Sequence, residues 1–408
     1  MINKESQAQF DEIFNELSRN LDITATQYEK AVSSYQAVGK WLSDDNSKLS
    51  PYSPEILPQG SFLLGTMIKP VLNTDELDVD LVCKLSGKQP DWSQFDLKSI
   101  VGKRLKENET YERMLDDEGR RCWTLNYADS FNYHMDILPA IVSSGYKLVL
   151  EKAFSMHDIQ DINATAIRIT DNQNENYYTD TNTENWNKSN PFGYAVWFQQ
   201  QCKIPTRKTL FLSESVNPIP KFQEDKLPLQ RVVQILKRHR DIMFKGHEDK
   251  PISIIITTLA AKAYGKEVDT SLALFNVVSK LRLMIEKRYS YEHGRYIEWI
   301  SNPVNDEENF ADKWPENNEK RENFYNWLTK LESDLKFISE QKGIHRIQES
   351  FSKSFGDSLS KVTFGNIADK TYTLRENENL HMNRSTGNLS SKQDESVLVK
   401  SHNFHGSK

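Results

Sequence analysis

The segment Pro-Gln-Gly-Ser-Phe-Leu-Leu-Gly-Thr at residues 58–66 leads to Glu-Leu-Asp-Val-Asp-Leu-Val at 76–82 and later to His-Met-Asp-Ile-Leu-Pro-Ala at 134–140. Apolar and polar residues alternate in the last two stretches, so both are predicted to be β-strands. Side chains two positions apart on a strand point to the same face, which places Asp78 and Asp80 together while their apolar neighbours face a core. The pattern therefore predicts a sheet on which Asp78, Asp80 and Asp136 converge.

Three carboxylates on one face repel each other unless a cation neutralises them. Mg²⁺ is the natural candidate, because it prefers oxygen ligands and keeps waters and phosphate oxygens in its shell. Two such ions about 4 Å apart would stabilise both the attacking and the leaving oxygen of an in-line displacement. We therefore predict that Asp78, Asp80 and Asp136 are catalytic residues that bind two Mg²⁺ ions, for which Mn²⁺ can substitute.

The segment around Gly60 predicts the complementary phosphate site. Glycine lets the backbone approach a polyphosphate closely, and the hydroxyl and N–H groups of Ser61 can donate to its oxygens. We assign Gln59, Gly60 and Ser61 to nucleotide binding. Taken alone, a Gly-Ser pair is usually a turn and an Asp-x-Asp strand is usually a solvated edge strand, so the interpretation depends on their combination.

Composition narrows the class of protein. The chain has 408 residues, which predicts two or three domains, and its formal charge of −6 argues against a protein that coats nucleic acid non-specifically. Its three cysteines, Cys83, Cys122 and Cys202, form no closely spaced pair, which excludes a disulfide framework and suits a reducing cytoplasm. The N-terminus has no signal-peptide pattern, and the apolar window 252–261 is too short to span a bilayer. We expect a cytoplasmic protein.

The order of patterns along the chain predicts an α+β protein. Residues 6–44 have helical periodicity with a break near 22–24, and the strands follow. The second half is mainly helical. Further helices are predicted at 227–244, 252–264, 271–287 and 319–340. The expected divisions are N-terminal helices at 1–50, a catalytic core at 51–200, a helical lobe at 201–372 and a polar, flexible tail at 373–408.

These motifs resemble the active site of the polymerase β-like nucleotidyltransferases. In detail the chain is similar to the bacterial cGAS/DncV-like nucleotidyltransferases (CD-NTases), the cyclic-oligonucleotide synthases of antiphage defence. Further matching segments are NPFGYAVWF at 190–198, LPLQRVVQILKRHRD at 227–241, KPISIIITTLAAKAY at 250–264 and NPVNDEENFADKW at 302–314. The resemblance implies a bilobal fold: a polymerase β-like core of mixed sheet and helices, a helical C-terminal lobe, and a long N-terminal helix that braces both.

The resemblance also implies a role for each aspartate. Asp78 and Asp80 would bind both metal ions, and Asp136 would bind the catalytic ion and help to activate the acceptor hydroxyl. Ser61 would hold the terminal phosphates of the donor. His134 lies on the same strand face as Asp136, but a packed or solvated histidine is the simpler interpretation.

Two residues of the helical half match family contacts to the triphosphate, Lys237 and Ser253. On the sequence alone, the charge run that contains Lys237 is typical of a solvated helix face, and Ser253 could simply cap a helix. Some relatives have a base-stacking aromatic residue after this serine, but this chain has Ile254 there. The stacking residue therefore stays open.

The function that this resemblance implies is synthesis of a cyclic di- or trinucleotide from nucleoside triphosphates, ATP among them, with release of pyrophosphate. The alternatives are a linear oligonucleotide synthase, an RNA-end nucleotidyltransferase, or a nucleotide-binding scaffold without turnover. No zinc-binding insertion is present, so direct sensing of double-stranded DNA is not expected, and neither is a membrane partner. The apolar and aromatic residues at 397–406 suggest a docking peptide for an operon-encoded regulatory or conjugating enzyme, or a tail that folds back onto its own surface.

Overall fold

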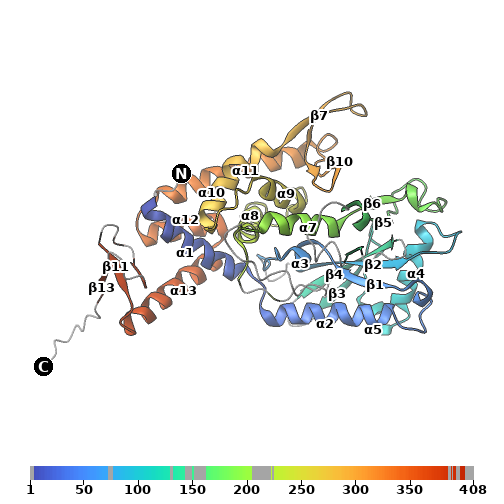
Figure 1. The fold of residues 1–408 in the computed structure, drawn as a ribbon, viewed down its shortest axis with the longest axis horizontal. Coiled ribbons are helices and arrows are strands. Elements are labelled where there is room, and N and C mark those ends of the chain that lie inside the picture. Colours follow the sequence, from blue (N-terminus) through green and yellow to red (C-terminus); the bar gives the residue numbers. More distant parts are fainter. Residues whose placement is uncertain are drawn as a thin grey trace.

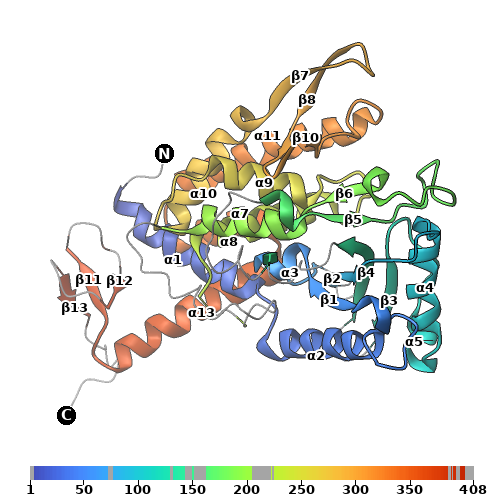
Figure 2. The same cartoon turned by 45° about the vertical axis from the view of Figure 1, so that its right-hand side comes forward.

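The computed structural model describes residues 4–71, 77–128, 132–142, 149–150, 162–204, 222, 225–384, 387, 389–391 and 396–399. Its elements form two bodies, a mixed sheet flanked by helices and a body of helices (Figure 1). Helices α7 and α8 lie on one side of the sheet and α2 lies on the other (Figure 2). The α+β fold with a helical second half is confirmed.

The N-terminal region forms two consecutive helices, α1 (Lys4–Leu21) and α2 (Ala25–Leu42). Thr24 begins the second helix with a capping box, in which its side chain accepts from the Gln27 N–H and the Gln27 side chain accepts from the Thr24 N–H. This cap is the physical reason for the break predicted near residues 22–24. Helix α1 contacts α8, α10 and α13, whereas α2 contacts β1 and α4. Helix α1 therefore packs on the helical body and α2 on the sheet body. Two helices take the place of the single long brace helix that the resemblance implied.

The sheet follows the order β1-β2-β4-β5-β6, and β3 also pairs with β4. Its strands are β1 (Glu55–Pro58), β2 (Leu77–Ser86), β3 (Trp123–Ala128), β4 (Asn132–Val142), β5 (Ile167–Ile169) and β6 (Asn187–Ser189). The helices of this body are α3 (Gly60–Leu64), α4 (Gln94–Lys106) and α5 (Glu109–Met114), with short 3₁₀ turns at Ser50–Tyr52, Ile162–Thr165 and Thr183–Asn185. Strands β2 and β4 are parallel and lie side by side over their full length, so both predicted aspartate strands are central.

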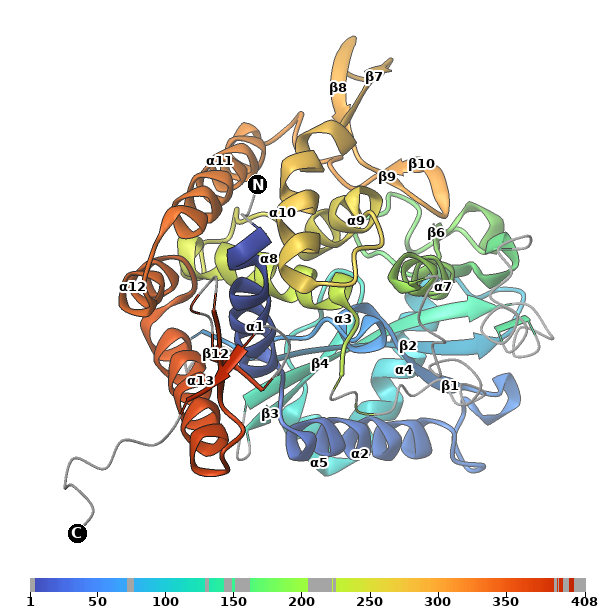
Figure 3. The same ribbon diagram turned by 60° about the vertical axis from the view of Figure 1, so that its left-hand side comes forward.

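The helical body is organised around α8. Its members are α7 (Pro191–Cys202), α8 (Pro228–Phe244), α9 (Ser253–Ala263), α10 (Thr270–Lys280), α11 (Asn318–Glu340), α12 (Ile344–Phe355) and α13 (Asp357–Glu376). Helix α8 contacts α1, α7, α9, α10, α11 and α12, and Figure 3 shows it surrounded by them. The most apolar helix, α9, has only 11 residues. Among the described residues, no helix is long and apolar enough to cross a membrane.

The helix predicted at 271–287 is wrong at its C-terminal end. Helix α10 stops at Lys280, and after a 3₁₀ turn (Leu281–Met284) the chain enters the hairpin of β7 (Glu286–Ser290) and β8 (Arg295–Trp299). Tyrosine, isoleucine and tryptophan in these strands favour β-structure, which outweighs the helical periodicity. A second hairpin follows, formed by β9 (Ser301–Asn302) and β10 (Asn305–Asn309).

The C-terminal region differs from the predicted flexible tail. The expected boundary at residue 373 falls inside α13, which continues to Glu376. Beyond it, β11 (His381–Asn383) pairs with β12 (Leu389–Ser390) and β13 (Ser396–Leu398). Backbone hydrogen bonds hold these strands together, so a polar composition does not exclude them. Most of the predicted docking peptide, residues 400–406, lies outside the described residues.

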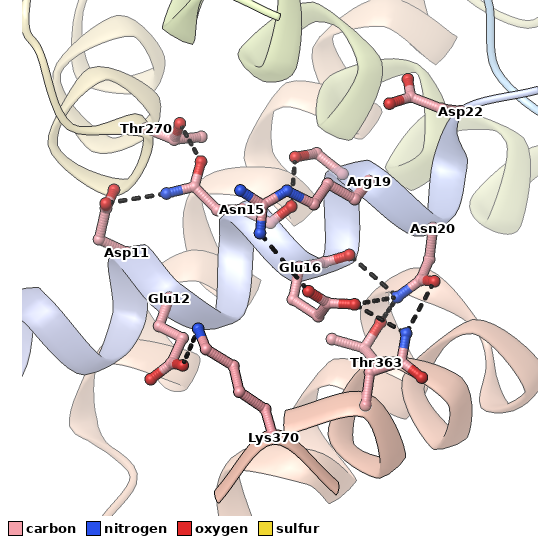
Figure 4. A network of polar contacts seen from close by, with 12 residues as sticks. Asp11, Glu12, Asn15, Glu16, Arg19, Asn20, Asp22, Thr270, Thr363 and Lys370 are labelled. Carbon is pink, nitrogen blue, oxygen red and sulfur yellow. Dashed lines mark hydrogen bonds and ion pairs between the residues drawn. The ribbon is translucent and has the colours of Figure 1, made fainter. Parts of the chain in front are cut away.

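Polar side chains join α1 to the end of the helical body (Figure 4). Glu12 pairs with Lys370 of α13 at 3.0 Å, and Thr270 of α10 donates to Asn15 at 2.6 Å. At the end of α1, Asp22 turns toward α8 and accepts from Arg231 at 2.6 Å. The N-terminal helix is therefore fixed to the helical body by polar contacts as well as by its buried apolar face.

Candidate active site

Strands β2 and β4 bring the three predicted aspartates onto one face of the sheet. In their parallel register, Asp80 is opposite Asp136 and Asp78 is opposite His134. Side chains of residues paired in this way lie on the same side of the sheet. The apolar residues that alternate with the aspartates of β2, Leu77, Val79 and Leu81, are fully or almost fully buried. The predicted convergence of Asp78, Asp80 and Asp136 is thus confirmed; their roles remain a proposal.

Asp80 is held closest to the glycine segment. The Gln59 N–H donates to the Asp80 backbone carbonyl at 2.8 Å, and Gly60 follows with φ +59°. A Cβ at Gly60 would lie 2.2 Å from Asp80 Oδ2, so only glycine allows this approach. Burial, and then the charges of Asp78 and Asp136, raise the pKa of Asp80 to about 6. A carboxylate crowded by two others is a site where a divalent cation would be stabilised.

The other two aspartates have direct hydrogen-bond partners. His134 Nε2 lies 2.6 Å from Asp78 Oδ1, and Thr124 on β3 donates to Asp136 at 2.6 Å. The interpretation of His134 as merely packed or solvated is therefore wrong, because strand register sets it against Asp78. Burial acts to raise the pKa of Asp78, but the hydrogen bond and charge of His134, together with the charges of Lys237 and Lys250, outweigh it and lower that pKa.

A cavity of about 480 Å³ opens beside Asp78. Its lining includes four of the predicted residues, Ser61, Asp78, Lys237 and Ser253, which come from α3, β2, α8 and α9. Residues separated by almost 200 positions thus meet at one space between the sheet and the helical body. Asp80 and Asp136 do not line this cavity but lie next to Asp78 on the same face.

Lys237 is buried, with 5 % of its surface exposed, so the interpretation of its charge run as a solvated helix face is wrong. Its Nζ donates to the Thr66 backbone carbonyl at 3.1 Å. Burial, and then the charge of Arg240, lower the pKa of Lys237 to about 8, although Asp80 and Asp78 act in the opposite direction. A buried cation near carboxylates is placed to receive an anionic phosphate.

The polar face of α8 holds the segment that follows α3. Gln230 donates to the Leu64 carbonyl at 2.9 Å, Gln234 to the Met67 carbonyl at 2.7 Å, and Arg238 to the Lys69 carbonyl at 2.6 Å. These donors recur at helical spacing, so one face of α8 binds a continuous run of backbone. The contacts fix the helical body against the segment that carries Ser61.

Ser253 does not cap α9. The N-cap position is occupied by Ile252, and Ser253 is the first helical residue and lines the cavity. Arg240 Nη1 donates to that hydroxyl at 2.9 Å. Ile254, which stands where some relatives have an aromatic residue, packs against the core of the helical body.

Sequence reasoning missed several basic residues of the cavity. Lys69, Arg240, Lys245 and Lys250 also line it, along with Asp241. Arg240 and Asp241 could have been found from the sequence, since they follow Lys237 by three and four residues and so share its helix face. The lysines lie outside helices and had no periodicity to reveal them.

The residues present fit divalent cations at the aspartates, since three carboxylates share one face and the pKa of Asp80 is raised by burial and then by the charges of Asp78 and Asp136. A second group of possible ligands lies on the surface, where atoms of His247, Asp249 and Glu319 are within 4.8 Å of one another. There Asp249 is already paired with Lys320. The aspartates of the sheet are therefore the better candidate.

Comparison with known proteins gives matches over most of the chain. Residues 9–151 match the family model described as the Second Messenger Oligonucleotide or Dinucleotide Synthetase domain. The chain is 30 % identical over 362 residues to the c-di-GMP synthase of Roseivirga ehrenbergii, covering 88 % of this chain and 87 % of that relative.

Solved structures share the fold at lower identity. The CD-NTase CdnG of Bradyrhizobium diazoefficiens in complex with GTP superposes with a TM-score of 0.64 at 19 % identity, covering 88 % of this chain and 99 % of that one. The CdnC:HORMA-deltaN complex of E. coli MS115-1 gives a TM-score of 0.57 at 14 % identity, covering 85 % and 96 %. These likenesses support the α+β fold of a sheet-containing core with a helical body.

Proposed function

The chain belongs to the CD-NTase family of nucleotidyltransferases, and we propose that it joins two GTP molecules into cyclic di-GMP with release of pyrophosphate, as a signal in antiphage defence. One structural observation carries the catalytic part of this proposal: Ser61, Asp78, Lys237 and Ser253 line a single cavity beside the aspartate face. The choice of product rests on the relative from Roseivirga ehrenbergii, which is named a c-di-GMP synthase. Other bases, or a ring of three nucleotides, are outcomes of the test below.

Asp78, Asp80 and Asp136 would hold two Mg²⁺ ions. The ions would supply charge neutralisation at the α-phosphate and lower the pKa of the attacking ribose hydroxyl. The chain's own contribution is to hold the carboxylates. Strand register aligns Asp80 with Asp136, and Thr124 orients Asp136 through its 2.6 Å hydrogen bond. Nucleotidyl transfer needs little from the protein beyond such positioning and charge.

Ser61, Lys237 and Ser253 would hold the terminal phosphates of the donor. The pKa of Lys237 is lowered to about 8 in the absence of a ligand. A bound triphosphate would keep this side chain protonated. Gly60 lets the backbone approach the phosphates and Asp80 together. Donor binding on the helical side and metal binding on the sheet side would place the α-phosphate between the two bodies.

The test is a product assay. Purified protein is incubated with labelled GTP, ATP, CTP and UTP and Mg²⁺ or Mn²⁺, followed by phosphatase and chromatography. We expect a phosphatase-resistant product from GTP alone that is absent with the Asp78→Asn/Asp80→Asn variant and present with the control Asp45→Asn, an exposed loop position. Linear products alone would overturn cyclisation but keep nucleotidyl transfer. No release of pyrophosphate from any mixture would favour a nucleotide-binding scaffold.

A regulatory partner is a further part of the proposal. CdnC, whose fold is similar, forms a complex with a HORMA protein. We propose that residues 397–406 dock an operon-encoded regulatory or conjugating enzyme. Deletion of residues 395–408 should abolish co-purification of that enzyme and leave GTP turnover unchanged. Unchanged co-purification would contradict a docking role for this segment.

A further inference from the structure

Arg240 lines the cavity one helical turn after Lys237, and only 6 % of its surface is exposed. All three of its guanidinium nitrogens are engaged. Nε and Nη2 each lie 2.8 Å from Asp241 Oδ1. Nη1 donates to the Pro251 carbonyl at 3.0 Å and to Ser253 Oγ at 2.9 Å. A single planar group therefore connects the end of α8 to the beginning of α9.

The direction of the Arg240–Ser253 hydrogen bond follows from the chemistry of the two groups. A guanidinium has N–H donors and no acceptor, so Ser253 Oγ must accept. The proton of the hydroxyl must then point elsewhere, and among the described residues this hydroxyl donates no hydrogen bond. Since Ser253 lines the cavity, this proton is available to a ligand there.

We infer that Arg240 is a positioning residue that orients the Ser253 hydroxyl to donate to a phosphate oxygen of the donor nucleotide. The inference rests on the proposed nucleotidyl transfer and deepens it. Asp241 holds the other edge of the guanidinium, so the group cannot turn away from Ser253 without losing bonds at both ends. The ligand class is a nucleoside triphosphate bound through its terminal phosphates.

The proposed role of Arg240 depends on the geometry of its guanidinium group and not on its positive charge alone. Lys69, Lys245 and Lys250 also bring positive charge to the cavity. A lysine in place of Arg240 would keep the charge, but one ammonium group cannot reproduce a fixed fork that reaches a carboxylate, a carbonyl and a hydroxyl together. The Arg240→Lys variant therefore separates the two contributions.

The experiment is a double-mutant cycle on nucleotide affinity. The full-length wild type, Arg240→Lys, Ser253→Ala and the double variant are titrated with a GTP analogue that has a methylene bridge between the α- and β-phosphates, in Mg²⁺. Loss of a hydrogen bond to a charged phosphate should weaken binding by roughly tenfold to a hundredfold in each single variant. The double variant should bind within about twofold of Ser253→Ala, because Arg240 acts through that hydroxyl.

A matched control tests the effect of losing a buried arginine in general. Arg104 is 8 % exposed and donates to the Trp41 carbonyl and to Glu107, and none of these three residues lines the cavity. Arg104→Lys should lower the thermal unfolding midpoint as Arg240→Lys does, but leave affinity for the analogue unchanged. If Arg240→Lys does not fold, Arg240→Gln enters the same cycle with the same requirement of non-additivity.

Two results would overturn the inference. One is unchanged affinity in the folded Arg240 variant; the other is an equal loss of affinity with and without the Ser253 hydroxyl, which would mean that Arg240 acts independently of it. The cycle needs no turnover. Failure to make a cyclic product would therefore count against the proposed function, and additivity in the cycle would count against the role of Arg240.

Discussion

Two polar regions next to the cavity, the aspartate face of the sheet and the α8 wall of the helical body, are stabilised in opposite ways. On the sheet, Asp78, Asp80 and Asp136 form the aspartate face, where burial and then the neighbouring carboxylates raise the pKa of Asp80. On the other side, buried donors of α8 are matched to backbone carbonyls of the segment 64–70. The donors of the α8 wall meet acceptors of the chain itself, whereas the aspartate face gathers three carboxylates, for which we propose divalent cations as further partners.

The contacts of the α8 wall make the fold rigid, whereas the carboxylates of the aspartate face are proposed to act in catalysis. Buried donors that meet acceptors contribute modestly to stability but fix one arrangement of the two bodies. Clustered carboxylates reduce the stability of the metal-free protein, as is common for catalytic sites. Substitutions on the two walls should therefore change different quantities, and the predictions below use this contrast.

The largest effect is expected for Asp80→Asn. The variant should lose nucleotidyl transfer by on the order of 10⁴-fold, because an amide cannot replace a carboxylate between two cations. Removing a crowded charge should at the same time stabilise the metal-free protein, by up to about 3 kcal/mol at neutral pH. Turnover assays and chemical denaturation without metal measure the two effects. A destabilised metal-free variant would show that the aspartate face is not strained.

On the α8 wall we expect loss of stability. Asp22 accepts from Arg231 and Gln234 and pairs with Lys226, and each of the two cations keeps less than a tenth of its side chain exposed. Asp22→Ala should lower the free energy of unfolding by about 3 kcal/mol, since it removes the carboxylate that pairs with two cations of low exposure.

The control for Asp22 is Glu12→Ala, which removes an exposed ion pair between α1 and Lys370 of α13 (Figure 4). Such surface pairs contribute about 0–1 kcal/mol. Urea denaturation of both variants gives the comparison. Equal losses would mean that burial of the Asp22 network adds nothing.

Gly60→Ala tests whether activity requires the close approach of the backbone at Gly60 to the Asp80 side chain. The new Cβ would lie 2.2 Å from Asp80 Oδ2 at a φ of +59°, so Asp80 must move. We expect turnover to fall by about 10²-fold, consistent with a barrier increase of ~2.7 kcal/mol. Gly365→Ala is the control, because a Cβ there meets nothing within 4 Å on α13. It should leave turnover unchanged; a fall equal to that of Gly60→Ala would contradict the steric argument.

The contrast between the aspartate face and the α8 wall also explains which features could be predicted from the sequence. The aspartate face was predictable because strand alternation is local, and six residues of β2 are enough to show it. The burial of Lys237 and Arg238 was not, because their partners are carbonyls of Thr66 and Lys69, about 170 positions away and invisible to any pattern of side chains. For the same reason His134 was misread, since only the register of β2 with β4 places it opposite Asp78.

The smallest expected effect is a pH dependence that belongs to Asp80. Its folded-state pKa of about 6 lies above the ordinary value of 3.8, so between these values the folded protein binds a proton that the unfolded chain has released. Stability of the metal-free protein that comes from this group is therefore present below about pH 4 and is lost as the pH rises through about 6.

Cations require the ionised form of Asp80, so apparent affinity for Mn²⁺ should fall about tenfold per pH unit below 6 and level off above about 7. Asp78 has a lowered pKa and stays ionised across this window, so it cannot produce the same titration. Calorimetric titration with Mn²⁺ from pH 5 to 8 measures the effect, and a midpoint near 4 would show that neither burial nor the charges of Asp78 and Asp136 raise the pKa of Asp80.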